Sequence, residues 1–290
     1  MAAQILDGKY LAQTIRNEIK MEVQAFIEET SIQPALAVIL VGDNPASKVY
    51  VRNKGKACIE TGMKSIQYDL PNELSQEELI ALIDKLNADP AIHGILAQLP
   101  LPPHIDVLAI QERILPIKDV DGLHPVNVGR LSLGCDCLVP CTPLGVIEIL
   151  KRADISIKGK QAVVVGRSHI VGKPMIQLLL KEHATVTVCH SRTQDLPAVC
   201  RTADILVAAT GQARMIRKEW IKPGAAVIDV GISFEERNGK IVQIGDVDRD
   251  EAEEIAGYLS PSPGGPGPMT IAMLMKNTLK AARMQLEEKQ

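Results

Sequence analysis

The segment VVVGRSHIVGKP, residues 163–174, most restricts the folds that this 290-residue chain can adopt. Three valines end at Gly166, and a helical pattern begins near Gly172, which predicts a strand, a tight turn and a helix N-terminus. Such a terminus offers free backbone N–H groups and the positive end of the helix dipole to an anion. The segment predicts a phosphate-binding turn. An ordinary strand-to-helix turn is the alternative, because the glycine spacing departs from G-x-G-x-x-G.

Strands and helices continue to alternate after this turn. We expect a helix over residues 171–182 and further strands over 184–189, 204–209 and 226–230. Strands separated by helices form parallel sheets with helices on both faces. The second half of the chain is therefore predicted to be an α/β domain with a Rossmann-like, doubly wound parallel sheet.

The end of the second predicted strand of this domain indicates which nucleotide it binds. Sites for NAD carry an acidic residue about 20 positions beyond the glycines, whereas a 2′-phosphate is bound by arginine and hydroxyl groups. The segment TVTVCHSRT has no acid there and instead provides His190, Ser191 and Arg192. Arg167 lies in the glycine turn, within reach of the same phosphate. Each residue alone is explained as well by a solvated loop, but together they favour NADP over NAD.

The first half of the chain repeats the alternation on a smaller scale, and we expect a second, smaller α/β domain. The predicted helices cover residues 8–29, 47–61, 76–87 and 105–114, and the predicted strands cover 35–41, 65–68 and 94–99. Turn residues make the segment KDVDGLHPVNVG at 118–129 loop-like.

Two further predicted helices, at 143–151 and 269–288, connect the halves. The expected domains are residues 1–140, completed by the helix within 269–290, and residues 141–268. A cleft between two such domains is the usual place for a substrate.

Composition narrows the class of protein. Hydrophobic residues make up 46% of the chain but aromatic residues only 2%, which suits an aliphatic core between parallel strands and helices. A net charge of −3 without a basic block gives no reason to expect nucleic acid. The sequence shows neither a signal peptide nor an apolar stretch that would span a membrane, so we expect a cytoplasmic protein.

The cysteines do not suggest a metal site. Cys135, Cys137 and Cys141 lie close together, but no histidine or second cysteine pair follows at the spacing of a zinc site. We expect free structural thiols and no bound metal.

Tyr50 and Lys54 lie four residues apart and therefore on one face of a predicted helix. The same spacing occurs in short-chain dehydrogenases, but there the pair follows the glycine turn, whereas here it precedes the turn by more than a hundred residues. Spacing alone favours a solvated helix face, because Lys48, Arg52 and Lys56 are neighbours.

A lysine in a partly desolvated cleft can nevertheless exchange protons near neutral pH. Gln98, at the end of a predicted strand, is placed to orient such a lysine without adding charge. Asp121 is a candidate for binding a polar heterocycle, with turn formation as its alternative.

Six motifs occur in a fixed order along the chain. They are YVRNK at 50–54, GILAQLPLP at 94–102, KDVDG at 118–122, PCTP at 140–143, VVVGRSHIVGKP at 163–174 and PGGPGPMT at 263–270. With these motifs the whole chain resembles the bifunctional methylenetetrahydrofolate dehydrogenase and methenyltetrahydrofolate cyclohydrolase family. The resemblance implies two activities that serve one-carbon metabolism and purine biosynthesis: NADP-dependent oxidation of 5,10-methylenetetrahydrofolate, and hydrolysis of the methenyl product to 10-formyltetrahydrofolate. It also implies a homodimer.

The resemblance assigns roles to individual residues. It makes Lys54 the central catalytic group, lets Gln98 position that lysine, stacks Tyr50 on the aminobenzoyl ring and lets Asp121 bind the pterin. The implied substrate contacts are Tyr50, Gln98, Leu99, Asp121, Pro263, Gly264 and Gly265. The implied NADP contacts are Thr142, Gly166, Arg167, Ser168, Ile170, Gly172, Ser191, Ile232 and Thr270, of which Arg167 and Ser191 hold the 2′-phosphate.

Ser262 and Pro266 replace apolar residues that are usual in the family, and the added proline predicts a stiffer loop near the cofactor. Two other functions fit parts of the pattern. An NADP-dependent dehydrogenase of another small substrate, such as shikimate, would explain the nucleotide domain but not the four residues Tyr50, Lys54, Gln98 and Asp121. A non-catalytic nucleotide-binding regulator would not require Lys54.

Overall fold

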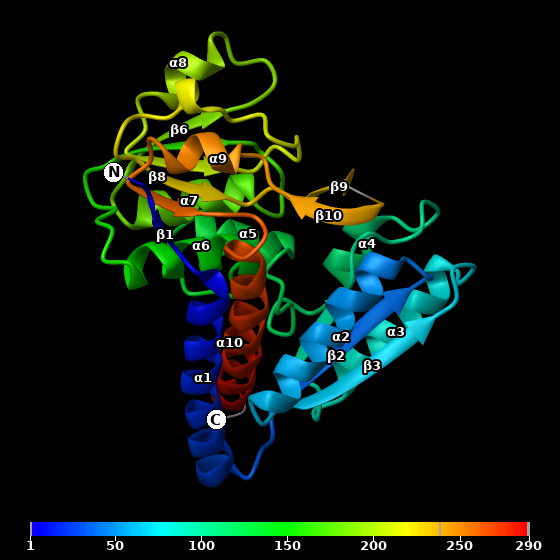
Figure 1. Ribbon diagram of the computed structural model, residues 1–290. Helices are drawn as coiled ribbons and strands as arrows, with labels where there is room; N and C mark the ends of the chain where they lie inside the picture. The colour runs from blue at the N-terminus through cyan, green and yellow to red at the C-terminus, as the bar shows by residue number, and fades with distance from the viewer. Residues whose placement is uncertain (1, 238, 289–290) are drawn as a thin grey trace. The chain divides into compact units, whose positions relative to one another are not determined.

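The computed structural model describes residues 2–237 and 239–288, which form two compact units (Figure 1). The six-stranded unit consists of Met1–Ala12 and Thr142–Thr270. The three-stranded unit consists of Gln13–Cys141 and Ile271–Gln290. In the described part of the chain, no helix combines the length and apolar character needed to cross a membrane.

The three-stranded unit is built around the parallel sheet β3-β2-β4. These strands are β2 (Ala35–Val41), β3 (Lys64–Leu70) and β4 (Gly94–Ala97). Every residue of β2 is buried, as expected for the central strand of a sheet covered on both faces. Alternate β2 residues, Ala35, Ala37 and Ile39, share a core with Leu79 and Ile83 of helix α3. The predicted small α/β domain is therefore confirmed.

Helices surround this sheet. They are α2 (Pro45–Glu60), α3 (Gln76–Ala88), α4 (Val107–Arg113) and α5 (Pro125–Ser132), with α1 (Gly8–Thr30) and α10 (Pro266–Glu287) extending into the unit. A capping box starts α3, because Ser75 accepts from the backbone N–H of Glu78 and the Glu78 carboxylate accepts from Ser75.

Helix α5 lies inside the segment 118–129 that the sequence predicts to be a loop, so that prediction is wrong from Pro125 onward. The turn-type residues start a helix: the His124 ring accepts from the backbone N–H of Val126, and Pro125 takes the first helical position. Buried Asn127 and Leu131 fix the inner face of α5.

The six-stranded unit contains one parallel sheet in the order β1-β11-β8-β7-β5-β6. Its strands are β1 (Gln4–Ile5), β5 (Gln161–Val165), β6 (Thr185–Cys189), β7 (Ile205–Ala208), β8 (Ala226–Asp229) and β11 (Tyr258–Ser260). Its helices are α6 (Cys141–Arg152), α7 (Gly172–Lys181), α8 (Leu196–Cys200), α9 (Arg249–Glu253) and the short 3₁₀ helix η1 (Lys218–Trp220). In this sheet β5 lies between β6 and β7. The chain runs from β5 to β6 on one side of β5 and then crosses to β7 on the other side. This reversal is the switch point at which doubly wound sheets bind ligands.

Four strands of this unit are absent from the sequence prediction: β1, its neighbour β11, and the two strands of a hairpin. The two-residue strand β1 is too short to show a period, yet it pairs with β11 and joins the first residues of the chain to this sheet, whereas the expected boundary puts them in the other domain. The hairpin of β9 (Ser233–Arg237) and β10 (Lys240–Ile244) forms a separate two-stranded sheet.

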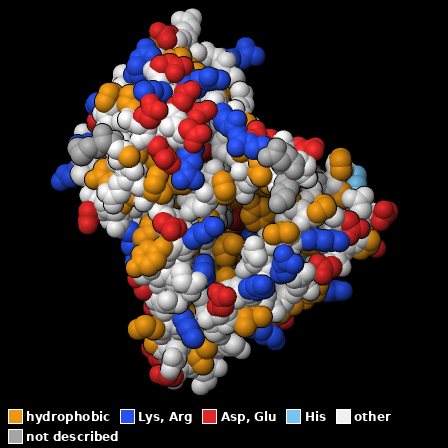
Figure 2. Space-filling view, in the orientation of Figure 1, with side chains coloured by type: hydrophobic (Ala, Val, Ile, Leu, Met, Phe, Trp, Pro, Cys, Tyr) orange, Lys and Arg blue, Asp and Glu red, His pale blue; other side chains and the backbone are white. Residues whose placement is uncertain are grey.

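Charged side chains of both signs are interspersed on the face shown in Figure 2, where no large area carries a single sign. This distribution agrees with the small net charge of −3.

Helix α10 carries one buried amide on its mostly apolar inner side. Asn277 is 3% exposed, and its Nδ2 donates to the carbonyl oxygens of Val120 and Val139, each at 2.8 Å. The amide thereby connects the C-terminal helix to the segment that carries Asp121.

Replacing Asn277 with leucine is expected to lower the free energy of unfolding by about 1–3 kcal/mol, because the carbonyl groups of Val120 and Val139 lose the amide donor. Urea unfolding followed by circular dichroism measures the change. The exposed Glu287→Gln variant on the same helix is the control and should stay within about 0.5 kcal/mol of the parent. Equal urea midpoints for Asn277→Leu and the parent would contradict a stabilising role for the Asn277 hydrogen bonds.

Candidate functional site

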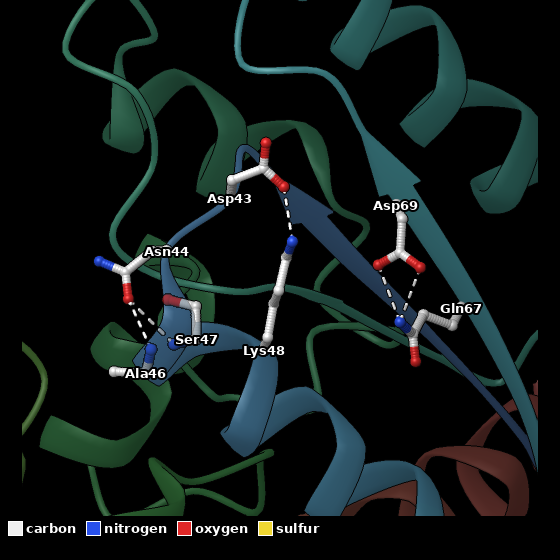
Figure 3. Close-up of polar contacts among 7 residues, drawn as sticks. All are labelled: Asp43, Asn44, Ala46, Ser47, Lys48, Gln67 and Asp69. Carbon is white, nitrogen blue, oxygen red and sulfur yellow. Dashed lines mark hydrogen bonds and ion pairs between the residues drawn. The ribbon is translucent and has the colours of Figure 1, made fainter.

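The start of helix α2 places the first group of candidate residues. Asn44 caps the helix, since its Oδ1 accepts from the backbone N–H groups of Ala46 and Ser47 at 3.0 and 3.1 Å (Figure 3). Lys48 pairs with Asp43 at 2.6 Å on the exposed side of the same turn. The cap and Pro45 fix where the helix begins, and hence which residues of α2 face inward.

Lys54 lies on the inward-facing side of α2. The buried residues of this helix are Ser47, Val51, Lys54, Ala57 and Cys58, which repeat at helical spacing. Lys54 is only 9% exposed, whereas the neighbouring cations Lys48, Arg52 and Lys56 are all exposed. The solvated helix face that spacing alone favours is therefore wrong for Lys54.

Gln98 holds the amine of Lys54. The Nζ of Lys54 donates to Oε1 of Gln98 at 2.8 Å, while Nε2 of Gln98 donates to the carbonyl oxygen of Leu99 at 2.6 Å. The second bond fixes the orientation of the amide, so that its oxygen faces the lysine. Strand β4 ends at Ala97, two residues earlier than predicted, but the N–H of Gln98 still bonds to Ile39.

Burial lowers the pKa of Lys54, while Asp121 and then Cys141 oppose this shift through their charges. Burial also raises the pKa of the Cys141 thiol well above its ordinary value, and Asp121 adds to the shift. The protonated thiol donates to the carbonyl oxygen of Val120. Lys54, Asp121 and Cys141 therefore form one electrostatically linked group in the three-stranded unit.

Two buried charged residues hold the KDVDG segment in place. The Nζ of Lys118 donates to three carbonyl oxygens at the end of α3, those of Leu86, Asn87 and Asp89. The Asp119 carboxylate accepts from the backbone of His124 and from the side chain of Asn127. These contacts fix the backbone on the N-terminal side of Asp121.

Tyr50 is half-buried one helical turn before Lys54, and burial raises the pKa of its phenol. An aromatic ring in this position presents part of its surface to a bound molecule.

In the six-stranded unit, the turn after β5 is shaped by two glycines. Gly166 has φ of +127°, and a Cβ added there would overlap the carbonyl oxygen of Ala209, which follows β7. A Cβ on Gly172 would overlap the carbonyl of Gly166. The Ser168 hydroxyl accepts from the N–H groups of Val171 and Gly172. The turn is closed tightly at the switch point, which allows a diphosphate to approach the backbone.

Polar residues gather at the ends of two neighbouring strands in this unit. Strands β5 and β6 pair directly, and the N–H of Gly166 donates to Cys189 at 2.9 Å. Arg167 follows the first strand, Ser191 and Arg192 follow the second, and all three are exposed. A phosphate at the carboxyl ends of these strands would meet both arginines.

The structure brings two predicted cofactor residues together. The Thr270 hydroxyl donates to Pro266, and the Thr142 hydroxyl is 2.9 Å from the Thr270 oxygen. Ile170 and Ile232 are 47% and 44% exposed, so each has apolar surface that a ligand could cover. The predicted substrate residues are divided, since Pro263, Gly264 and Gly265 belong to the six-stranded unit and the others to the three-stranded unit.

The substitutions Ser262 and Pro266 have structural roles. Ser262 Oγ donates to the carbonyl oxygen of Gly231 at 2.7 Å and accepts from Nε2 of Gln243 at 3.1 Å. Pro266 is the first residue of α10, where proline is favoured, so it starts the helix rather than stiffening the loop as predicted. Gly265 lies against the N-terminus of α1, because a Cβ on Gly8 would overlap its carbonyl.

A doubly wound sheet with a phosphate-binding turn, joined in one chain to a unit that buries a lysine, defines a dinucleotide-dependent enzyme. The family model described as tetrahydrofolate dehydrogenase/cyclohydrolase, catalytic domain, matches residues 6–121. The NAD(P)-binding domain of the same family matches residues 140–286.

Individual relatives agree with the family models. The bifunctional protein FolD of Geobacillus thermodenitrificans is 56% identical over 283 residues, covering 98% of each protein. The structure of FolD methylenetetrahydrofolate dehydrogenase/cyclohydrolase from Campylobacter jejuni has a TM-score of 0.93 at 50% identity, covering 98% of this chain and 99% of that one. The Trypanosoma brucei enzyme, in complex with NADP and an inhibitor, has a TM-score of 0.95 at 41% identity and 99% coverage of both chains.

The chain belongs to the tetrahydrofolate dehydrogenase/cyclohydrolase family. The resemblance stated from the six motifs is thereby confirmed. Family membership favours the bifunctional folate enzyme over a shikimate-type dehydrogenase and over a silent regulator.

Sequence reasoning missed several residues that support the site. The sequence predicts only a structural thiol at Cys141, although the charges of Lys54 and Asp121 both shift the pKa of this thiol. Asn277 could have been found as an amide that follows a run of mostly apolar residues in a long predicted helix. The pairing of Ser262 with Gly231 left no signal, because the contact spans 31 residues of separate loops.

Replacing Ser262 with alanine or valine is expected to lower the free energy of unfolding by about 1 kcal/mol, because the hydrogen bond to Gly231 is lost. Urea unfolding measures the difference. The control is Ser191→Ala, an exposed serine of the same unit, which should leave stability unchanged. If Ser262→Ala were as stable as this control, the hydrogen bond would have no stabilising role.

Proposed function

We propose that this chain oxidises 5,10-methylenetetrahydrofolate to the 5,10-methenyl form with NADP⁺ and then hydrolyses that product to 10-formyltetrahydrofolate. In the first step a hydride leaves the one-carbon bridge and NADP⁺ becomes NADPH. In the second step water adds to the cationic carbon, the ring opens and one proton is released. The observation that carries the proposal is the buried Lys54 amine held by Gln98 in a chain of this family.

Lys54 is proposed to move protons during the hydrolytic step. A lowered pKa increases the neutral fraction of its amine, and a neutral amine can accept a proton as water adds. Gln98 orients the Nζ through its oxygen without adding a charge that would restore the ammonium form. Asp121 limits how far the pKa falls, and therefore helps to set the pH at which Lys54 changes state.

The folate contacts remain assigned by the family resemblance, and the structure gives them a physical basis. The half-buried Tyr50 ring is proposed to stack on the aminobenzoyl group, and Asp121 to accept hydrogen bonds from the pterin. Gln98 and Leu99 are proposed to contact the same molecule, with the 263–265 loop contributing Pro263, Gly264 and Gly265. A cleft between the domains remains a prediction.

NADP⁺, when bound, supplies the hydride acceptor for the oxidation. The tight turn at Gly166 and Gly172, with Ser168, fits its diphosphate, because the glycines leave no side chain between the ligand and the backbone. Arg167 and Ser191 are proposed to hold the 2′-phosphate. Ile170, Ile232, Thr142 and Thr270 are proposed to line the rest of the site.

We further propose that the protein is cytoplasmic, as expected from the sequence, and that it is a homodimer, as the family resemblance implies. The mass in solution, measured by sedimentation, is the test of the dimer.

Lys54→Met is expected to lower the cyclohydrolase kcat by at least about 100-fold, the usual contribution of a positioned acid–base group. Loss of the methenyl absorbance measures this activity. Methionine keeps a long side chain at the buried position and removes only the proton-carrying amine.

Lys56→Met is the matched control, because Lys56 lies on the exposed side of the same helix. It should retain the parent rate. Full cyclohydrolase activity in Lys54→Met would remove Lys54 from the proposed mechanism.

Arg167→Ala is expected to raise KM for NADP⁺ by about 10- to 100-fold, since a charge-assisted hydrogen bond to a phosphate contributes about 1.5–3 kcal/mol. KM for NAD⁺, which lacks the 2′-phosphate, should not change. Formation of NADPH or NADH from methylenetetrahydrofolate measures both values. An equal rise for the two nucleotides would show that Arg167 does not distinguish them.

A further inference from the structure

Two buried aspartates lie at the carboxyl ends of strands in the six-stranded unit. Asp229 is the last residue of β8 and is 2% exposed, and Asp246 lies two residues after β10 and is 0% exposed. Neither residue is among the predicted contacts of the folate or the cofactor. Buried carboxylates are costly unless they are compensated, so both need a physical explanation.

Both carboxylates bind the backbone of loops at the same edge of the sheet. Oδ1 of Asp229 accepts from Gly231 at 3.0 Å and from the N–H of Asp246 at 2.9 Å, and Oδ2 accepts from Val247 at 3.1 Å. Oδ2 of Asp246 accepts from the N–H groups of Thr210 and Gly211. The pair therefore holds the segments that follow β7, β8 and β10.

Two glycines let the carboxylates lie directly against these loops. A Cβ on Gly231 would overlap the Asp246 carboxylate, and a Cβ on Gly245 would overlap that of Asp229. The segment after β8 continues into Ile232, and the segment after β7 begins with Ala209, against which Gly166 packs. Both segments thus shape the proposed cofactor site.

One oxygen of the pair lacks a partner. Oδ1 of Asp246 is fully buried and has no hydrogen bond among the described residues. Burial raises the pKa of Asp229 to about 7, and the charge of Asp246 adds to the shift. A proton on Asp229 would both remove the repulsion and provide the donor that Asp246 lacks.

Cations on the neighbouring segments are paired elsewhere. Arg214, whose N–H bonds to Gly245, directs its guanidinium to Glu235 of β9. Arg217 and Lys218 pair with Glu251 and Glu254 near α9, and Arg249 pairs with Glu253. Asp248 accepts from the N–H of Glu251 as the cap of α9. None of these cations forms a described salt bridge with Asp229 or Asp246.

We propose that Asp229 and Asp246 share one proton and act as a positioning pair for the cofactor site, with the Asp229 carboxyl donating to Oδ1 of Asp246. The proposal rests on the proposed function, because it takes the segments around Thr210 and Ile232 as walls of the NADP site. Neither aspartate reacts or contacts the cofactor. They hold the loops that do.

The proposal predicts how NADP⁺ binding depends on pH. Below about pH 7 the pair holds its proton and the three segments are fixed. As the pH rises through about 7 Asp229 loses this proton and its charge repels that of Asp246, so the segments separate and affinity falls. The same sign applies to stability, since the folded state binds this proton more tightly than the unfolded chain does.

The test is titration calorimetry of NADP⁺ against the parent and Asp246→Asn from about pH 6 to about pH 8.5. The asparagine oxygen still accepts from Thr210 and Gly211, while its NH₂ donates to Asp229, so no proton is needed. We expect Kd of the parent to rise about three- to tenfold over this range and Kd of Asp246→Asn to rise at most about half as much. The 2′-phosphate of NADP⁺ titrates in the same way with both proteins. Its contribution therefore cancels in the ratio of the two Kd values.

Two variants sharpen the comparison. Asp248→Asn removes a neighbouring charge outside the pair, and it should keep the pH dependence of the parent. Asp229→Asn should weaken NADP⁺ binding at every pH. Both Asp229 oxygens accept from backbone N–H groups, so the NH₂ of asparagine would point at one of these donors and displace its loop.

An equal pH dependence in the parent and Asp246→Asn would overturn the positioning pair. Absence of NADP⁺ binding to the parent at any pH would instead overturn the proposed function. If Asp246→Asn does not fold, infrared difference spectra of the parent between the two pH limits decide the matter. A protonated buried carboxyl band at the lower pH is expected, and its absence contradicts the shared proton.

Discussion

The desolvation of one amine is the constraint on which the three-stranded unit depends. Lys54 lies on the inward side of α2, so its ammonium form is destabilised, and the hydrogen bond that it donates to Gln98 replaces only part of the lost hydration. The position of that amide depends on the carbonyl of Leu99, immediately beyond β4. The position of Asp121 depends on Lys118, Asp119 and Asn277, each of which satisfies buried backbone groups. Contacts from most of the unit therefore fix the surroundings that lower the pKa of this one amine.

The six-stranded unit uses charge at its strand ends in a different way. There the arginines proposed to bind a negatively charged ligand are exposed, whereas the buried carboxylates bind the backbone of loops. Both units follow one rule of parallel sheets, because their polar groups lie at the carboxyl ends of the strands. The difference lies in solvent access, which is small around Lys54 and large around Arg167.

Much of this arrangement could be predicted from the sequence because it depends on local pattern. The valine run before Gly166 and the seven apolar residues of β2 define strands without tertiary information. The motifs around Lys54, Gln98 and Asp121 identified the family. What could not be predicted depends on distant contacts: β1 has only two residues and exists because β11 pairs with it. The burial of Lys54 but not of Lys56 depends on which side of α2 meets the sheet, and the helix at Pro125 begins from residues that elsewhere form turns.

The pairing of β1 with β11 and the bonds of Asn277 have a consequence for biosynthesis. Each joins an early part of the chain to a late one: Gln4 aligns with Tyr258, and Asn277 bonds to Val120 across 157 residues. Neither unit is one continuous stretch of sequence. On the ribosome, the N-terminal segment must wait for nearly the whole chain before its strand has a partner. Each unit is therefore complete only after β11 or α10 has been synthesised, and the earlier segments expose unpaired apolar surface until then.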